Sequence, residues 1–489
     1  MSQQLTQNMS SKKTIRTRMA PSPTGEMHVG SMAMVLKNYA FAKKHDGQFI
    51  LRVEDTDKER EIPGCIDQIM QVIHKYGLEW DEGPGKGGPF KPYLQSQRLE
   101  IYKTHVQELI EKGRAYHCFC SKERLEDLRD EQRQQKIPPK YDRHCTKLPQ
   151  AEVKQKMAQG KPYVIRLRVP DHQKIIFNDL IRGEIIVESR IIDDQILLKS
   201  DGFPTYHLAV VVDDHLMKIS HVMRGEEWIS STPKHVLLYQ AFGWELPVFA
   251  HIPIFLNPNG KGKMSKRKGT VSAQSFLDKG YLPQALLNFF MILGWASTDQ
   301  REILSLAEYI QEFDPKNLSK NSVVFDTKKL DWINGVYIRK MKKTDLKKQL
   351  QNFLPADFPH HQIDEILPLV KERLIRLTDI EDLTSFFYRP VELDKALLIK
   401  RGDQVLASQQ LTEINRKLGK IKEWSAPHLE KVIRELQTET GWHKKQFFMM
   451  LRVAVTGLTA TPPLFETMAV LGKKRVQERL EQALVLVKK

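Results

Sequence analysis

The segment of residues 14–47 constrains the fold more than any other part of the chain. Its first seven residues alternate side chains as a short strand does, and Pro21 and Pro23 then impose a stiff, extended turn. From Gly30 onward, apolar residues recur at helical spacing until Gly47 ends the pattern. A strand, a tight loop and a helix start in this order form a phosphate site, because the N–H groups and the dipole of the helix attract an anion.

Two residues at this helix start carry specific chemistry. His28 can donate a hydrogen bond to a phosphate oxygen without becoming a nucleophile, and Gly30 lets a flat base or sugar approach the backbone. The alternative is an ordinary strand–helix turn with a polar surface histidine, which a four-residue motif by itself favours.

A basic loop at residues 260–269 lies far downstream. It reads Gly-Lys-Gly-Lys-Met-Ser-Lys-Arg-Lys-Gly and has no apolar periodicity. Such a loop can fold over a triphosphate, where ammonium groups meet the charge that builds on departing pyrophosphate. On its own, the same composition is typical of a solvated loop or a nucleic-acid patch.

Together these segments resemble the two signatures of class I aminoacyl-tRNA synthetases. His28-Val29-Gly30-Ser31 corresponds to HIGH, and Lys263-Met264-Ser265-Lys266-Arg267 corresponds to KMSKS. Four further stretches resemble bacterial-type glutamyl-tRNA synthetases, and the likeness runs from about Ile15 to the C-terminus. These stretches are APSPTG at 20–25, RVEDTD at 52–57, YHLA at 206–209 and RGEEW at 224–228.

The resemblance implies an α/β fold with a helical C-terminal half. A Rossmann-like class I catalytic domain would carry an inserted α/β module and be followed by an all-α anticodon-binding half. Apolar runs that end in charged clusters, at residues 206–215 and 221–228, are expected to form buried parallel strands. The implied divisions are 1–13 (disordered tail), 14–93 with 201–245 (Rossmann-like domain), 94–200 (inserted acceptor-end-binding module), 246–337 (stem-contact domain with the basic loop) and 338–489 (helical anticodon-binding region).

The resemblance also implies ATP-dependent ligation of L-glutamate to tRNA(Glu) through glutamyl-adenylate, with Mg²⁺ accompanying ATP. No protein nucleophile is required, since the substrate carboxylate is already ionised and the task is positioning and charge neutralisation. His28, Lys263 and Lys266 would be the catalytic residues. The implied ATP contacts are Pro23, Gly25, His28, Gly30, Ser31, Glu227, Trp228, Lys263, Ser265 and Lys266.

A substrate with two carboxylates needs cations that keep their charge when water is removed. Arginine does so, and its planar fork pairs bidentately with a carboxylate. By resemblance Arg18 and Arg224 would flank the side-chain carboxylate, the Tyr206 hydroxyl would donate to it, and Glu54 would hold the α-amino group. The implied glutamate contacts are Arg18, Ala20, Ser22, Glu54, Tyr206 and Arg224. An acidic turn and strand-end surface charges are the alternative interpretation.

Two positions bear on specificity. Well-known members carry asparagine after Tyr-His-Leu-Ala, whereas this chain has Val210, which cannot hydrogen-bond a substrate. The resemblance places Arg373 where discriminating members inspect the last anticodon base.

Three cysteines have the spacing of a metal knuckle: Cys118, Cys120 and Cys145. Some family members bind zinc here with a histidine two residues past the third cysteine, where this chain has Lys147. Structural zinc is normally four-coordinate, so a fourth ligand is needed, and His117, His144 and Tyr141 are candidates. Reduced structural cysteines are the alternative.

Composition limits the functional classes. A net charge of +16 indicates a polyanionic partner, which we expect to be tRNA, and no apolar run approaches the length of a membrane span. Four cysteines in 489 residues favour a reducing compartment over a disulfide scaffold. Residues 1–13 lack the pattern of a signal or transit peptide. We therefore expect a cytoplasmic protein, and a monomer.

Three other functions fit parts of the sequence. A non-discriminating synthetase would also charge glutamine tRNA with glutamate. A short paralogue that modifies a tRNA base lacks the helical C-terminal half found here. A non-catalytic tRNA-binding protein is disfavoured by the intact motif residues His28, Gly30, Lys263 and Lys266.

Overall fold

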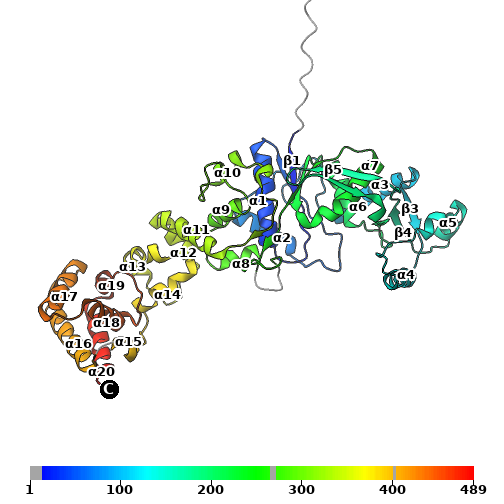
Figure 1. Ribbon diagram of the computed structural model, residues 1–489. Helices are drawn as coiled ribbons and strands as arrows, with labels where there is room; N and C mark the ends of the chain where they lie inside the picture. The colour runs from blue at the N-terminus through cyan, green and yellow to red at the C-terminus, as the bar shows by residue number, and fades with distance from the viewer. Residues whose placement is uncertain (1–13, 265–270, 400–402) are drawn as a thin grey trace, which may run out of the picture. The chain divides into compact units, whose positions relative to one another are not determined.

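The computed structural model describes residues 14–264, 271–399 and 403–489. The chain divides into two compact units, residues 1–276 with 286–327 and residues 277–285 with 328–489. The described part of the first unit contains helices and strands, whereas the regular elements described after residue 327 are all helical. The expected α/β fold followed by an all-α half is therefore observed (Figure 1).

The N-terminal strand–helix–strand segment is confirmed. Strand β1 (Arg16–Met19) pairs in parallel with β2 (Gln48–Leu51), and helix α1 (Val29–Lys44) connects them. Both strands are largely buried: β2 is mostly apolar, whereas β1 carries Arg16 and Arg18, which pair with the buried carboxylates of Glu82 and Asp214. The α1 dipole thus points its positive end toward the loop of residues 20–28.

The second half of the fold contributes β8 (His221–Gly225) and β9 (Val248–Ile252), which are parallel and joined through α7 (Thr232–Phe242). These strands belong to a sheet of order β6-β5-β9-β8. The Ser220 N–H donates to the Arg16 carbonyl at 3.0 Å, which sets β8 beside β1. The buried strand expected at residues 221–228 is thus present over 221–225.

The expected strand at residues 206–215 is wrong. Tyr206–Leu216 forms helix α6, preceded by an extended Thr205. Its residues 208–214 are all buried, so the helix shows no polar face that would reveal its period. A short, continuous apolar run fits a buried strand and a buried helix equally well, and valine-rich composition favoured the strand.

The segment between the two halves carries its own small sheet, of order β3-β4-β7. Its strands β3 (Ala115–Cys118), β4 (Val164–Leu167) and β7 (Ile196–Leu198) are antiparallel. The hairpin of β5 (Lys174–Asp179) and β6 (Gly183–Glu188) instead joins the sheet of β8, because Asp179 pairs with Phe249 of β9. Helix α2 (Cys65–Lys75) precedes this segment, whose own helices are α3 (Leu99–Glu111), α4 (Lys122–Gln134) and α5 (Gln150–Ala158).

Short elements lead from the α/β unit into the helical unit. Strands β10 (Phe255–Leu256) and β11 (Val323–Val324) pair in parallel. The intervening helices are α8 (Ala273–Asp278), α9 (Pro283–Ile292) and α10 (Leu306–Glu312). The helical unit then contains α11 (Thr327–Lys340), α12 (Lys343–Leu350), α13 (Ile363–Val370), α14 (Ile380–Thr384), α15 (Lys395–Leu398), α16 (Gln404–Gly419), α17 (Ala426–Thr440), α18 (Lys444–Thr456), α19 (Leu464–Leu471) and α20 (Lys473–Lys488).

The last helix packs through one apolar stripe. Val476, Leu480, Ala483 and Val487 of α20 are buried, Leu484 is half-buried, and α20 packs against α16. None of the described helices is both long and apolar enough to cross a lipid bilayer.

Candidate active site

A cavity of about 610 Å³ lies where β1 and β8 end and α1 begins. Crevices at the carboxyl ends of parallel strands are the usual ligand sites of α/β folds. The structure brings most of the predicted contact residues to the wall of this one cavity. They are Arg18, Ala20, Ser22, His28, Gly30, Ser31, Glu54, Tyr206, Arg224, Glu227, Trp228 and Lys263.

Four predicted contacts are not on this wall. Ser265 and Lys266 lie outside the described residues. Pro23 is buried, and its carbonyl accepts the Ile62 N–H at 2.9 Å, while Gly25 has a φ of 140°. These two residues shape the loop that carries the cavity wall.

His28 caps helix α1 with its own ring. Its Nδ1 accepts the Gly30 N–H at 2.9 Å, so the proton of the neutral ring resides on Nε2. The Val29 N–H is bonded to the Val271 carbonyl at 2.9 Å. Two N–H groups at the helix start are therefore already used, so part of the backbone phosphate site that the motif suggested is occupied within the protein.

Gly30 is required by this cap. A Cβ at Gly30 would lie 3.0 Å from His28 Nδ1, which is closer than side chains normally approach. Gly30 also lines the cavity. The absence of a side chain thus keeps the His28 ring in place as well as leaving room for a ligand.

Arg18 and Glu54 belong to a buried ion-pair network. Arg18 pairs with Asp214 through Nε and Nη2 at 3.1 and 3.2 Å, and Asp214 also accepts Arg52 Nη1 at 2.6 Å. Arg52 Nη2 donates to Glu54 Oε1 at 3.2 Å, and burial raises the pKa of Glu54. A ligand ammonium group in the cavity would stabilise the Glu54 carboxylate.

Arg52, Asp213 and Asp214 lie behind the cavity wall, and sequence reasoning did not predict that they support Arg18 and Glu54. Asp213 accepts from Arg98 Nε at 2.7 Å, and Arg52 lies 3.7 Å away. All three are buried at 0–3% exposure. Two adjacent carboxylates inside the run from Leu208 to Leu216 were the available signal, since charges in an apolar segment need buried partners.

Arg224 is buried without a carboxylate partner among the described residues. Its Nη1 donates to the Tyr206 hydroxyl at 3.0 Å and its Nη2 to Thr232 Oγ1 at 2.9 Å. The remaining neighbours are His235 Nδ1 at 3.3 Å and His251 Nε2 at 3.2 Å. Burial lowers the pKa of Arg224 and also those of both histidines, so neutral groups surround a buried cation.

The arginines around the inner cavity differ in their partners. Arg18, Arg52 and Arg98 each pair directly with a buried carboxylate of Glu54, Asp213 or Asp214. Among the described residues Arg224 pairs directly with no carboxylate and is linked to Asp179 only through His251. The Arg224 guanidinium is therefore available to an anionic group of a ligand.

Tyr206 presents its hydroxyl proton as a donor. The hydroxyl oxygen accepts from Arg224, and burial raises the pKa of Tyr206 to about 12, so the group stays protonated at neutral pH. Its ring packs against Trp228, with centroids 4.4 Å apart. Trp228 is 37% exposed and offers an apolar face to a flat ligand on the same wall.

Lys263 reaches the cavity rim from the basic loop. Its Nζ lies 3.1 Å from Glu227 Oε1, and both side chains are about half exposed. The two parts of the sequence that suggested a phosphate site, His28 and Lys263, thus face one cavity. An ion pair this exposed contributes little stability, so an anionic ligand can compete for Lys263.

Val210 does not line the cavity. It lies on α6 and packs in the core with 1% exposure. The missing hydrogen-bonding group at this position therefore removes no side chain from the cavity wall.

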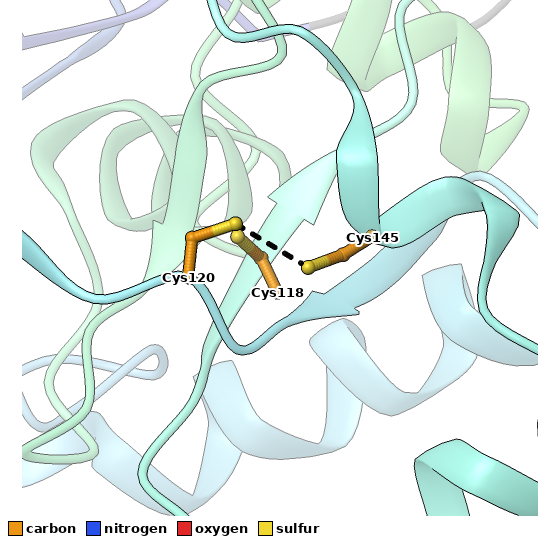
Figure 2. Close-up of side chains that lie close together, drawn as sticks. All are labelled: Cys118, Cys120 and Cys145. Atoms are coloured by element: carbon orange, nitrogen blue, oxygen red, sulfur yellow. Dashed lines mark hydrogen bonds between the residues drawn. The ribbon is translucent and has the colours of Figure 1, made fainter. Parts of the chain in front are cut away.

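The three cysteines converge in the inserted segment (Figure 2). Their sulfur atoms lie within 4.8 Å of one another, and Cys120 Sγ is 3.5 Å from Cys145 Sγ. The Tyr141 hydroxyl lies 3.4 Å from Cys118 Sγ and 3.3 Å from Cys120 Sγ, and hydrogen bonds from Cys145 and Tyr141 lower the pKa of Cys118. Three sulfurs and one oxygen around a common point fit a tetrahedral zinc ion.

The other candidate ligands lie elsewhere. His117 packs against Phe119 and Tyr163, with ring centroids 6.3 and 5.0 Å away. His144 and Lys147 are exposed. Tyr141 is therefore the fourth ligand that this geometry favours.

Arg373 is an exposed cation in the helical unit, directly after α13. Burial and the nearby Arg373 lower the pKa of Arg452. Two neighbouring cations of this kind fit an anionic partner such as RNA.

Comparison with known proteins finds relatives that match nearly the full length of the chain. The family profile for the class I tRNA synthetase (E and Q) catalytic domain matches residues 14–332, and an anticodon-binding-domain profile matches residues 345–484. The chain is 42% identical over 491 residues to a glutamate–tRNA ligase of Finegoldia magna, covering 96% of this chain and 99% of that one. A glutamate–tRNA ligase of Acidothermus cellulolyticus is 43% identical over 486 residues, covering 96% and 95% of the two chains.

Solved structures give the same result. A glutamate tRNA ligase from Elizabethkingia meningosepticum in complex with its amino acid matches with a TM-score of 0.88 at 34% identity, over 97% of this chain and 99% of that one. A glutamate-tRNA synthetase from Elizabethkingia anophelis matches with a TM-score of 0.87 at 34% identity, over 96% and 100%.

Proposed function

The chain belongs to the class I tRNA synthetases of the glutamate and glutamine type, and from that premise we propose that it ligates L-glutamate to tRNA(Glu). The reaction proceeds in two steps. The α-carboxylate of glutamate attacks the α-phosphorus of ATP, supplied with Mg²⁺, and pyrophosphate leaves. The terminal ribose of the tRNA then takes the glutamyl group from the adenylate and releases AMP.

The charge on the inner cavity wall carries this proposal. The Arg224 guanidinium lines the cavity and pairs directly with no carboxylate among the described residues, so it can take the side-chain carboxylate of glutamate. Its side-chain carboxylate would face Arg224 and the Tyr206 hydroxyl, and its ammonium group would face Glu54. Glutamine has the same shape but no net charge, so it would leave the buried guanidinium unbalanced.

The other wall of the cavity supports the role of ATP. His28, Gly30 and Ser31 line the cavity at the start of α1, and Trp228 offers a ring face to the base. Lys263 stands at the rim on the loop that also carries Lys266 in the sequence. Cations here stabilise the pyrophosphate more as its bond to the α-phosphorus breaks than in bound ATP.

Aminoacylation of total tRNA with labelled glutamate and labelled glutamine tests the proposal. We expect glutamate to be attached, glutamine to be rejected, and tRNA(Glu) to be recovered as the charged species. Charged glutamine, or no charging with either amino acid, would refute it. Glutamate found on glutamine tRNA as well would identify a non-discriminating enzyme.

Arg373 provides a separate test of tRNA choice. We propose that it inspects the last anticodon base, because the family resemblance places it at that position and its side chain is exposed. Arg373→Ala should raise KM for tRNA(Glu) by about tenfold, since one charged contact to RNA contributes on the order of 1–3 kcal/mol. The KM for glutamate should not change. Arg434→Ala, which removes an exposed arginine of α17, is the control, and equal effects of both changes would contradict a specific role.

We further propose that Cys118, Cys120, Cys145 and Tyr141 hold a structural zinc ion. Protein purified without chelator should contain about one zinc per chain by elemental analysis, because structural sites bind zinc tightly. Cys120→Ser should remove most of it. Cys65→Ser, which changes a buried cysteine outside the cluster, should leave the zinc content unchanged. Wild-type protein without zinc after growth in zinc-supplemented medium would contradict the site.

A further inference from the structure

His251 connects Arg224 to a buried carboxylate. Arg224 and His251 are register partners on the parallel strands β8 and β9, and Arg224 Nε lies 3.2 Å from His251 Nε2. On the other side of the ring, His251 Nδ1 lies 2.7 Å from Asp179 Oδ2, at the end of β5. Asp179, His251 and Arg224 therefore form a chain of hydrogen bonds across three neighbouring strands, with each member buried.

The two ends of this chain fix the tautomer of the ring. The Arg224 Nε group can only donate, so His251 Nε2 must accept, and the ring proton must reside on Nδ1. The Asp179 carboxylate accepts that proton, and it also accepts the His251 backbone N–H at 2.9 Å. Burial lowers the pKa of His251, and the ring therefore stays neutral beside the guanidinium.

This arrangement holds Arg224 in place without cancelling its charge. A glutamate or aspartate at position 251 could accept the same hydrogen bond, but it would serve as an internal counter-ion. A neutral histidine satisfies the donor and leaves the charge for a ligand. Asp179 itself accepts from His251 and from the N–H groups of Ile181 and Arg182, each of these two at 2.9 Å, and it makes no direct hydrogen bond to Arg224.

We infer that Asp179 and His251 are positioning residues for glutamate selection: they orient the Arg224 guanidinium and leave its charge available to the side-chain carboxylate of the substrate. The inference rests on the proposed function, because it assigns the ligand of Arg224 as glutamate. Neither residue lines the cavity, so both act through Arg224.

A double-mutant cycle separates this role from general support of the fold. An asparagine in place of Asp179 can turn its NH₂ group toward His251 Nδ1, which then accepts and moves the ring proton to Nε2, facing Arg224. A carboxylate that sets a histidine tautomer has this effect in other enzymes when it becomes an amide. We expect Asp179→Asn to raise KM for glutamate by about tenfold, the loss of a hydrogen bond to a charged group. The KM for ATP should stay within about twofold.

The same change should have little effect when His251 is glutamine. A glutamine can turn its carbonyl oxygen toward Arg224 whatever residue 179 is, because an amide has no tautomer to set. In the His251→Gln background, Asp179→Asn should therefore change KM for glutamate by less than about twofold. A tenfold increase in both backgrounds would show that Asp179 acts only on the fold, and would overturn the inference.

A second, size-matched pair decides the question if Asp179→Asn does not fold. His251→Gln keeps an acceptor for Arg224 Nε, whereas His251→Met has nearly the same length and accepts only weakly. We expect His251→Met to raise KM for glutamate by about tenfold relative to His251→Gln, with KM for ATP and the melting temperature alike in the two variants. Equal KM values for glutamate would overturn the inference.

The assay is ATP–pyrophosphate exchange with tRNA(Glu) present, run on the full-length protein at varied glutamate and varied ATP. If the wild-type protein exchanges pyrophosphate with glutamate but Asp179→Asn raises KM for glutamate equally in both backgrounds, the inference is overturned and the proposed function stays intact. Wild-type protein that shows no exchange with glutamate refutes the proposed function, and the inference falls with it.

Discussion

Replacing Arg224 with glutamine is expected to lower kcat/KM for glutamate on the order of a hundredfold. Removing one partner of a buried, hydrogen-bonded charge pair costs about 2–5 kcal/mol, and each 1.4 kcal/mol corresponds to a factor of ten. The substrate carboxylate would lose its guanidinium partner and keep the Tyr206 hydroxyl. Selectivity for glutamate over glutamine should therefore fall, whereas KM for ATP should not change.

Steady-state pyrophosphate exchange with each amino acid measures this result. Arg114→Gln is the control, because Arg114 is an exposed arginine that lies away from the cavity wall. If the melting temperature of Arg224→Gln is close to that of the wild type, the lower kcat/KM is not caused by unfolding. If Arg224→Gln kept the wild-type preference for glutamate, the assignment of the inner cavity to the side-chain carboxylate would be wrong.

Replacing Lys266 with alanine is expected to lower kcat on the order of a hundredfold or more and to change KM for ATP by less than about threefold. A cation aimed at charge that develops in the transition state contributes about 3–4 kcal/mol there and less to the bound substrate. Lys266 lies outside the described residues, so this prediction rests on the motif and on Lys263, three residues earlier, which reaches the cavity rim.

Single-turnover adenylate formation measures the chemical step directly. Lys261→Ala removes an exposed lysine of the same loop that does not line the cavity, and it should react like the wild type. Equal losses in kcat and in ATP affinity would mean that Lys266 binds ATP without stabilising the transition state. An unchanged kcat would remove Lys266 from the reaction.

Local sequence signals predicted the helices and strands whose apolar residues recur at a recognisable spacing. The prolines after β1 and the apolar spacing of α1 gave the correct order of strand, loop and helix. Helix α6 was missed because burial on all sides hides its polar and apolar faces, and valine favours strands in isolation. The family resemblance is confirmed by profiles and relatives that span nearly the whole chain.

Some residues of the candidate site could be predicted from the sequence and others could not. Residues within recognisable motifs, such as His28 and Lys263, were predicted, and they face one cavity although they lie far apart in the sequence. The residues that hold Arg224 were not predicted. Asp179 and His251 belong to different strands, and their hydrogen bond depends on the registers of β5, β9 and β8, which no local pattern encodes.

The central claim is that a single cavity binds glutamate at Arg224 and the phosphates of ATP between His28 and the basic loop. A crystal structure with a non-hydrolysable glutamyl-adenylate analogue tests this claim most directly. We predict that the glutamyl carboxylate lies within hydrogen-bond distance of Arg224 and Tyr206, and that the adenylate lies along the wall formed by His28, Gly30 and Trp228. An analogue bound with its glutamyl group away from Arg224, or outside this cavity, would contradict the account.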